Sequence, residues 1–238
     1  MITFEDMLTV QNLTIAFKSQ DDFIPVVNNI SFNLKPNEIL GVVGESGSGK
    51  SVSTLAISGL LPKKISKITS GNIIFEGTSL LEYSNAQMTM LRGKEIAMIF
   101  QEPMSALNPS MTCGAQVLEI IMQHKDITPA KAKVETLQLF EKVKLPRPKD
   151  IFKSYPHQIS GGQMQRVMIA MAIACKPKIL IADEPTTALD VTVQKEIIQL
   201  LKALQKETKM SIIFISHDLA LVSEIAQRVI VMHKGNIV

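Results

Sequence analysis

The sequence has few cysteines and few aromatic residues, and it lacks any apolar run long enough to cross a bilayer. Its two cysteines, Cys113 and Cys175, are too few for a disulfide framework or a cysteine-based metal site, so we interpret both as small packing residues. Aromatic residues make up 5% of the chain and the net charge is only +3, with the lysines dispersed, which argues against nucleic-acid binding. The longest obvious apolar run, residues 167–175, is far shorter than the roughly 20 residues of a membrane-spanning helix.

The chain also lacks a charged-then-apolar signal segment at its start, so we expect the protein in the cytoplasm. Its 238 residues suffice for one large domain, or for a core with a small inserted subdomain. No internal repeat or low-complexity tract is visible. Any membrane association would therefore depend on partner proteins.

What the chain does contain is a phosphate-binding loop at residues 44–51, with the pattern G-x-x-x-x-G-K-S. It lies between the apolar run 38–43 and a helix-like stretch that begins near Ser51, which is the strand, loop and helix context that the motif requires. Backbone N–H groups and the helix N-terminus would bind phosphates, Lys50 would reach the β- and γ-phosphates, and the Ser51 hydroxyl would ligate Mg²⁺. On this motif alone, the alternative is a glycine-rich turn with a chance Lys-Ser pair. The nucleotide-binding residues that we expect at this loop are Gly44, Glu45, Ser46, Gly47, Ser48, Gly49, Lys50, Ser51 and Val52.

Two adjacent carboxylates follow an apolar segment at residues 178–182, which reads as a short buried strand. If the strand extends through Asp183 and Glu184, their side chains point in different directions, so one carboxylate can hold Mg²⁺ while the other faces the attacking water. Their alternative interpretation is an ordinary strand-end turn. A second strand at 211–215 is followed by His217, which we expect at the same carboxyl edge of a parallel sheet.

With these motifs in this order, the chain resembles the ATP-binding cassette (ABC) family over nearly every residue. The resemblance assigns a glutamine loop to Gln101, the Mg²⁺ aspartate to Asp183, the catalytic glutamate to Glu184 and the switch histidine to His217. It also assigns a D-loop that ends at Asp190, and a signature motif preceded by Ile159 in place of the commoner leucine. The signature residues are Ser160, Gly161, Gly162 and Gln163.

The fold class that the resemblance and the segment pattern imply is α/β. We expect a P-loop NTPase core with a mainly parallel sheet, an antiparallel β-subdomain, and an inserted α-helical subdomain at about 104–158, so that the core comprises 1–103 and 159–238 of a single domain. Antiparallel strands are expected over 8–17, 30–34 and 72–75, with Asp21, Asp22 and Pro25 marking the loop between the first two. Asn108-Pro109 and residues 145–148 break the helical segment into pieces.

The mechanism implied by the resemblance requires two subunits. The signature motif of one subunit closes over the triphosphate held by the other, so two ATP molecules lie in a head-to-tail dimer, and Asp190 communicates across the interface. Gln101 acts as a γ-phosphate sensor and as a Mg²⁺ ligand with Ser51 and Asp183. The partner is either a second copy, a paralogue or a fused cassette.

Adenine stacking requires an aromatic side chain, which family members place at the end of the first strand. Phe17 occupies that position, and Phe23 is the alternative because the following loop is long. Either could instead be a core phenylalanine.

The amino-acid sequence at 99–109, 154–158 and 183–193 is similar to that of the ATPases of peptide and nickel importers. Such a subunit lies on the inner face of the membrane through its permease subunits, which bind the helical subdomain, and depends indirectly on an extracytoplasmic solute-binding protein. Residues 233–238 read as a hairpin whose second strand has only begun, so we expect a longer natural chain.

Two other function classes are the alternatives to an importer ATPase. A DNA-repair or chromosome-organising ATPase would carry a long coiled coil or zinc modules between Gln101 and Ser160, but only 59 positions (160 − 101) separate them. An ATP-dependent switch cassette would usually have a degenerate residue at 184, whereas Glu184 is intact.

Overall fold

The computed structural model describes residues 6–20, 22–187 and 189–238, which form two compact units. Unit 1 comprises residues 1–89 and 209–238, and unit 2 comprises residues 90–208. The chain therefore leaves unit 1 and returns to it. No helix of the described residues is both long and apolar enough to cross a membrane.

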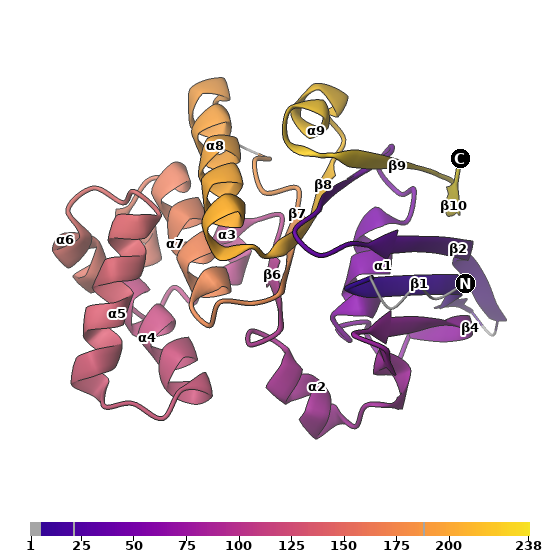
Figure 1. Cartoon of the computed structure of the whole chain (residues 1–238), viewed down its shortest axis with the longest axis horizontal. Helices are drawn as coiled ribbons and strands as arrows, with labels where there is room; N and C mark the ends of the chain where they lie inside the picture. Colours follow the sequence, from indigo (N-terminus) through magenta and orange to yellow (C-terminus); the bar gives the residue numbers. More distant parts are fainter. Residues whose placement is uncertain (1–5, 21, 188) are drawn as a thin grey trace. The chain divides into compact units, whose positions relative to one another are not determined.

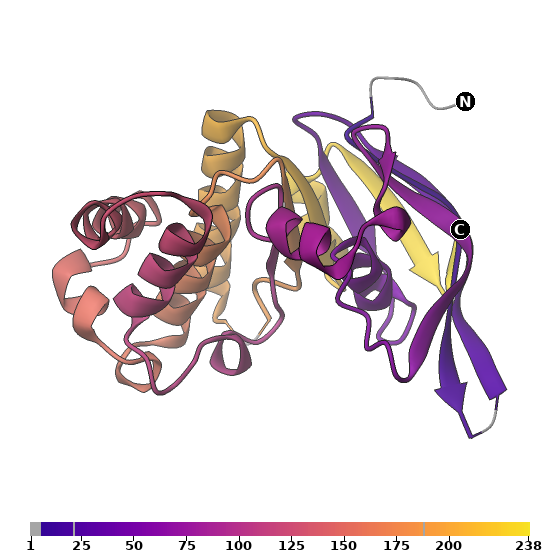
Figure 2. The same ribbon diagram turned by 90° about the horizontal axis from the view of Figure 1, so that it is seen from below.

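Unit 1 contains an antiparallel sheet with the strand order β2-β1-β4-β5 (Figure 1). The long β1–β2 hairpin is seen from another side in Figure 2. Buried aliphatic side chains alternate along β1, including Leu13 and Ile15, and form the core face of this sheet. The strands are β1 (Leu8–Ser19), β2 (Asp22–Leu34), β4 (Ser66–Phe75) and β5 (Thr78–Ser79).

The prediction of a loop between the first two strands is wrong in part. Asp22 and Pro25 lie within β2, and Asp21 lies outside the described residues. Proline is tolerated there because β2 is an edge strand, so that no further strand of this sheet needs the N–H group that proline lacks. The pairing with β1 also shifts register beside Pro25.

Parallel strands form the second sheet region of unit 1, in the order β9-β3-β8, with the short antiparallel strand β10 beside β9. All five residues of β3 are buried, as are all six of β8, which explains why both segments are continuous apolar runs. Helix α1 follows β3, and α9 follows β8. The elements are β3 (Ile39–Val43), α1 (Lys50–Ile57), β8 (Ser211–Ser216), α9 (Leu219–Ile225), β9 (Arg228–His233) and β10 (Asn236–Ile237). η1 (Leu80–Glu82) lies near the end of the first segment of unit 1, and α2 (Asn85–Leu91) runs across the boundary at residues 89 and 90.

Unit 2 combines a parallel strand pair, β6 and β7, with helices. The predicted helix breaks are confirmed, because α3 ends before Asn108 and the chain between α5 and α6 contains residues 143–147. The elements are β6 (Ile96–Ile99), α3 (Pro103–Ala106), α4 (Cys113–His124), α5 (Pro129–Lys142), α6 (Pro148–Lys153), η2 (Pro156–Gln158), α7 (Gly161–Ile173), β7 (Ile179–Asp183) and α8 (Val191–Thr208). Helices α4 to α6 fall inside the segment 104–158 that the sequence assigns to a helical insertion, whose boundaries stay a prediction.

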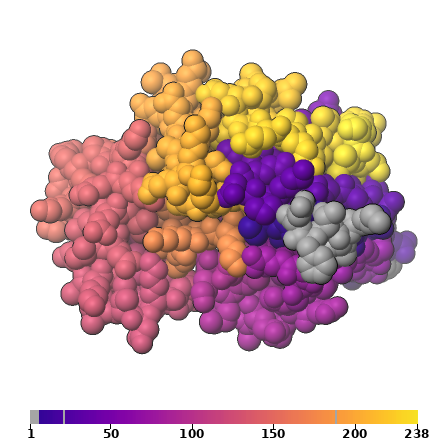
Figure 3. Space-filling view, viewed as in Figure 1, coloured from indigo at the N-terminus to yellow at the C-terminus, as the bar shows by residue number. Residues whose placement is uncertain are grey.

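Helix α7 forms the centre of unit 2, with nine of its 13 residues buried. Arg166 on this helix is 8% exposed, and its guanidinium donates to the carbonyl oxygen of Val143 at 2.8 Å and to the carboxylate of Glu196 on α8 at 2.6 Å. Arg166 therefore links the end of α5, α7 and α8 by charge-assisted hydrogen bonds. One side of α8 remains exposed on the surface (Figure 3).

The burial of the two cysteines fits a packing role for Cys113, whereas that role stays a prediction for Cys175. Cys113 is fully buried and Cys175 is partly exposed, and both are free thiols. Burial raises the pKa of the Cys113 thiol to about 11 and also raises the pKa of Cys175. At neutral pH both are therefore mainly protonated, which is the poorly nucleophilic form.

Candidate functional site

The phosphate loop connects β3 to α1 in unit 1. Gly49 is the N-cap of α1 with φ of 101°, a left-handed backbone that glycine adopts without strain. A side chain at Gly44 would collide with the carbonyl oxygen of Met232, so the loop also needs glycine where it leaves the strand. The sequence predicted this strand, loop and helix context, and the structure has it.

The lysine of the loop is buried, with Lys50 only 5% exposed. Its Nζ donates to the carbonyl oxygens of Gly44 and Glu45 at 2.7 and 2.9 Å. The ammonium therefore lies against the loop in which a phosphate would bind. Ser48 is 3% exposed, and its buried hydroxyl finds no hydrogen-bond partner among the described residues. An unpaired buried hydroxyl and a buried cation in a glycine loop fit a phosphate group. Ser51 follows Lys50 in the first turn of α1.

His217 lies at the same sheet edge as the phosphate loop. Strands β3 and β8 are parallel, and their last residues, Val43 and Ser216, are register partners. The next residues along the two strands are Gly44 and His217, so both follow the same edge of the sheet. The exposed His217 is followed by Asp218, whose carboxylate accepts from the backbone N–H groups of Ala220 and Leu221 and caps α9.

The structure separates the two candidate adenine-stacking residues. Phe23 already has the Lys67 ammonium over its ring, 3.9 Å from the centroid. Phe17 shares a face of β1 with Ile15, whose partner Val27 is the side chain that a Cβ on Gly49 would approach to 3.1 Å. Phe17 thus lies on the face of the antiparallel sheet that faces the phosphate loop, which favours it over Phe23.

In unit 2, Asp183 and Glu184 lie at the carboxyl end of β7. Asp183 is the last residue of the strand and is 6% exposed. Glu184 lies beyond the strand with φ of 46°, a left-handed conformation that is uncommon for a residue other than glycine. Strand alternation was expected to separate the two side chains only if the strand extended through Glu184, and β7 ends at Asp183. The turn of the backbone at Glu184, rather than the pleat, therefore sets its direction.

Gln101 reaches the Glu184 carboxylate. Its amide Nε2 donates to Glu184 Oε2 at 3.1 Å, although the two residues are 83 positions apart in the sequence. They come together because β6 and β7 are parallel neighbours with Ile99 paired to Ala182, and each of the two residues lies two positions after its member of that pair. The hydroxyl of Thr187 donates to the same oxygen at 2.9 Å. The sequence did not single out Thr187, and its position three residues after Glu184 is the signal that could have done so.

The signature motif forms the N-terminus of α7. Ser160 is the N-cap, with its hydroxyl accepting from the Gln163 N–H at 3.3 Å while the Gln163 side chain accepts from the Ser160 N–H at 3.0 Å. This capping box fixes the start of the helix and leaves its positive dipole end at the signature glycines. A Cβ on Gly162 would lie 2.8 Å from Val193 at the start of α8, whereas a Cβ on Gly161 would meet only Leu189, at 3.8 Å.

Asp190 caps the next helix. Its Oδ1 accepts from the backbone N–H groups of Thr192 and Val193 at 3.1 and 3.0 Å. The D-loop and the signature motif are thus neighbours within one unit, since Leu189 and Val193 both approach the signature glycines. Any role of Asp190 across a subunit interface stays a prediction.

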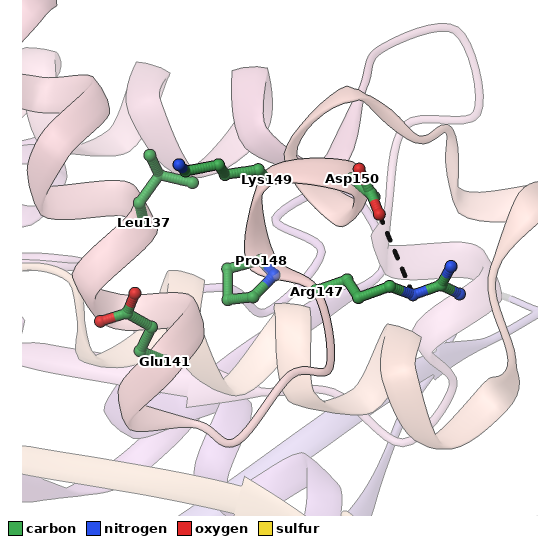
Figure 4. A pocket seen from close by; sticks show the side chains of 6 residues that line it. All are labelled: Leu137, Glu141, Arg147, Pro148, Lys149 and Asp150. Atoms are coloured by element: carbon green, nitrogen blue, oxygen red, sulfur yellow. Dashed lines mark ion pairs between the residues drawn. The ribbon is translucent and has the colours of Figure 1, made fainter.

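A hollow lies between α5 and α6, and none of the residues predicted for the site lines it (Figure 4). It has a volume of about 320 Å³, and Arg147 and Asp150 at its rim form an exposed ion pair at 3.9 Å. An exposed pair of this kind contributes little binding energy, so we assign no ligand to this hollow. Its lining residues are Leu137, Glu141, Arg147, Pro148, Lys149 and Asp150.

Comparison with known proteins agrees with the motif order. The profile of the family described as ABC transporter matches residues 27–187. The chain belongs to the ABC transporter family. It is 49% identical over 238 residues to the glutathione import ATP-binding protein GsiA of Escherichia coli O1:K1 / APEC, covering 98% of this chain and 38% of that protein. It is 47% identical over 231 residues to the dipeptide transport ATP-binding protein DppD of Bacillus subtilis (strain 168), covering 97% of this chain and 69% of that protein.

A solved structure shares the fold. A dimeric ATP-binding cassette in a post-hydrolysis state, bound to ADP and Pi, matches with a TM-score of 0.87 and 28% identity, covering 97% of this chain and 96% of that one. The predicted fold class and the resemblance to ABC subunits of peptide importers are therefore confirmed. The chain spans 38% of the length of one of these relatives and 69% of another.

Proposed function

We propose that this ABC cassette hydrolyses ATP and powers an importer for peptides or related small solutes. The observation that carries the proposal is the hydrogen bond from Gln101 to Glu184, which joins the predicted glutamine loop to the predicted catalytic glutamate. Family membership and the relatives named as import ATP-binding proteins support it. ATP is the expected nucleotide because the related cassette structure holds ADP and Pi.

In this proposal, the chain's own residues bind and orient the substrate. The backbone N–H groups of the phosphate loop and the Lys50 ammonium hold the triphosphate, and Phe17 stacks on adenine. Glu184 orients the attacking water and accepts its proton, while His217 contacts the γ-phosphate. The negative charge of the transferring phosphoryl group is met by fixed N–H groups and a cation, with little reorganisation of the site.

The oxygen atoms of Ser51, Gln101 and Asp183 suit Mg²⁺, which prefers hydroxyl, carbonyl and carboxylate ligands. Gln101 uses its amide nitrogen on Glu184, so its carbonyl oxygen is the end available to a cation. Mg²⁺, when bound, would neutralise phosphate charge. We propose these three residues as its ligands.

The signature motif supplies the second half of the site in trans. The start of α7 is a helix N-terminus capped by Ser160, which is suited to an anion. We propose a head-to-tail dimer with a second copy or a paralogue, in which two ATP molecules are sandwiched. The dimeric state of the related cassette supports this arrangement.

ATP should drive dimer formation when hydrolysis is blocked. We expect Glu184→Gln to be monomeric without nucleotide and dimeric with ATP and Mg²⁺ in sedimentation velocity, because bound triphosphate supplies the contacts to the partner's signature motif. Wild-type protein given ADP serves as the control and should stay monomeric. A Glu184→Gln sample that remains monomeric at high concentration with ATP would exclude the homodimer and favour a paralogous partner.

The importer assignment rests on similarity to proteins named for glutathione and dipeptide transport. We propose peptide-like solutes as the cargo and keep nickel chelates as the alternative. The cassette would lie on the inner face of the cell membrane by binding permease subunits, which receive solute from an extracytoplasmic binding protein. The sequence shows no pattern that would direct it to nucleic acid.

The permease contact is expected on α3, where Met104 is 67% exposed. Met104→Glu should lower permease-stimulated hydrolysis and solute uptake by roughly 5–150-fold, the usual range of coupling between sites, while hydrolysis by the free cassette changes little. Met122→Glu is the matched control, because Met122 is also an exposed methionine of unit 2 but lies on α4. Reconstituted permease, binding protein and cassette give both readouts. Equal losses in the two variants, or vectorial export, would contradict the importer coupling.

A further inference from the structure

The turn after β7 contains a contact that the ABC motifs do not assign. Residues 184–187 form a tight turn in which the Thr187 N–H donates to the carbonyl oxygen of Glu184 at 3.2 Å, with Pro185 in the second position. Proline favours this position because its fixed φ suits a turn. The turn brings the Thr187 side chain back over the residue that starts it.

The Thr187 hydroxyl then bonds to the Glu184 carboxylate. Its Oγ1 lies 2.9 Å from Glu184 Oε2, which also accepts from Gln101 Nε2 at 3.1 Å. An ionised carboxylate offers only acceptors, so the hydroxyl and the amide nitrogen must both donate. Two donors that converge on one oxygen, from different parts of the chain, fix the side-chain torsions of the glutamate more firmly than either donor alone.

The two donors differ in what else they can do. Gln101 follows β6, and its amide would also meet Mg²⁺ in the proposed site, so its bond to Glu184 is subject to change when nucleotide binds. Thr187 belongs to the same four-residue turn as Glu184 and moves with it. Its neighbour Thr186 is buried and makes a different contact: its hydroxyl accepts from Gln194 Nε2 of α8 at 3.2 Å.

We infer that Thr187 is a positioning residue for the hydrolytic reaction: its hydroxyl holds the Glu184 carboxylate in the orientation that aligns the attacking water. The inference rests on the proposed function of Glu184 as the base. A base that is preoriented within its own turn avoids a reorganisation at each turnover. The bond is to a charged group, so its loss has a larger effect than that of a neutral hydrogen bond.

The test compares Thr187→Val, which keeps the shape and loses the hydroxyl, with Thr187→Ser, which keeps the hydroxyl. We expect Thr187→Val to lower kcat roughly tenfold or more with KM for ATP within about twofold of wild type, and Thr187→Ser to restore most of kcat. Thr186→Val makes the same chemical change one residue away and should leave kcat within about twofold. An equal fall in kcat for Thr186→Val and Thr187→Val would show that the variants act by disturbing the turn and not by removing the bond to Glu184. That result would overturn the inference.

A double-mutant cycle with Glu184→Gln separates this inference from the proposed function. If Thr187 acts through Glu184, Thr187→Val should cause no further loss in the Glu184→Gln background. Loss of the same factor in both backgrounds would overturn the positioning role. If Glu184→Gln itself keeps wild-type turnover, the proposed function fails. If Glu184→Gln is inactive while Thr187→Val matches wild type, only the inference about Thr187 fails.

Discussion

Replacing Glu184 by glutamine should lower kcat for ATP hydrolysis by roughly 10²–10⁴-fold, the usual contribution of a general base. The amide keeps the shape of the side chain, and its oxygen can still accept from Gln101 and Thr187, so the turn after β7 should persist. What it loses is the charge that polarises water and accepts a proton. ATP affinity should change by only a fewfold, because the phosphate loop lies in unit 1 and makes its contacts through other residues.

Single-turnover hydrolysis and equilibrium binding of ATP measure the two quantities separately. Thermal unfolding without nucleotide is the control for folding and should match wild type. Turnover within a fewfold of wild type would remove Glu184 from the role of base and would leave the water to be activated by another group.

Replacing Lys50 by alanine should instead weaken nucleotide binding, by roughly 10–100-fold in Kd if one charge-assisted contact to phosphate is lost. The ammonium is buried at the loop and bonds to the carbonyl oxygens of Gly44 and Glu45, so it also helps to hold the loop in shape. Both effects reduce the affinity for triphosphate.

Titration with a fluorescent ATP analogue measures this loss. Lys64→Ala is the matched control, because Lys64 is an exposed lysine of the same unit and should bind ATP as wild type does. Unchanged affinity in Lys50→Ala, or an equal loss in both variants, would contradict the assignment of Lys50 to the phosphates.

Local patterns sufficed to predict three of the parallel strands, β3, β7 and β8, and the helix breaks. The phosphate loop follows a five-residue strand buried throughout, and such uniform burial gives a continuous apolar run that is easy to identify. The signature motif contains its own helix start, since Ser160 and Gln163 form a capping box that can be read from their spacing. These features are encoded by residues close together in the sequence.

The antiparallel strands were harder to delimit. β2 begins at Asp22 rather than at the expected residue 30, and β1 extends to Ser19, two residues beyond its expected end. Asn12 and Asn29 have positive φ and lie where the register shifts, which breaks the two-residue alternation on which the prediction depends. Bulges of this kind weaken the period-two pattern by which a strand is delimited.

The geometry around Glu184 also lay beyond sequence reasoning. Its left-handed backbone replaces the strand alternation that we expected, and the contact with Thr187 arises from that turn. The choice between Phe17 and Phe23 likewise required the sheet register and the position of Lys67, which the order of residues does not give. Motifs predicted which residues take part, whereas their orientation depended on the three-dimensional arrangement.

Complementation between two defective chains tests the central claim, that each ATP site is built from two subunits. One chain carries Lys50→Ala and the other carries Gly161→Asp; a side chain at Gly161 meets only Leu189 at an ordinary distance, and an acid at a helix N-terminus preserves α7 while repelling phosphate. Each variant alone should be inactive. Mixed in equal amounts, half of the dimers pair the two chains and contain one intact site, so hydrolysis should return to roughly a quarter of the wild-type rate. A mixture no more active than its separate components would contradict the shared site.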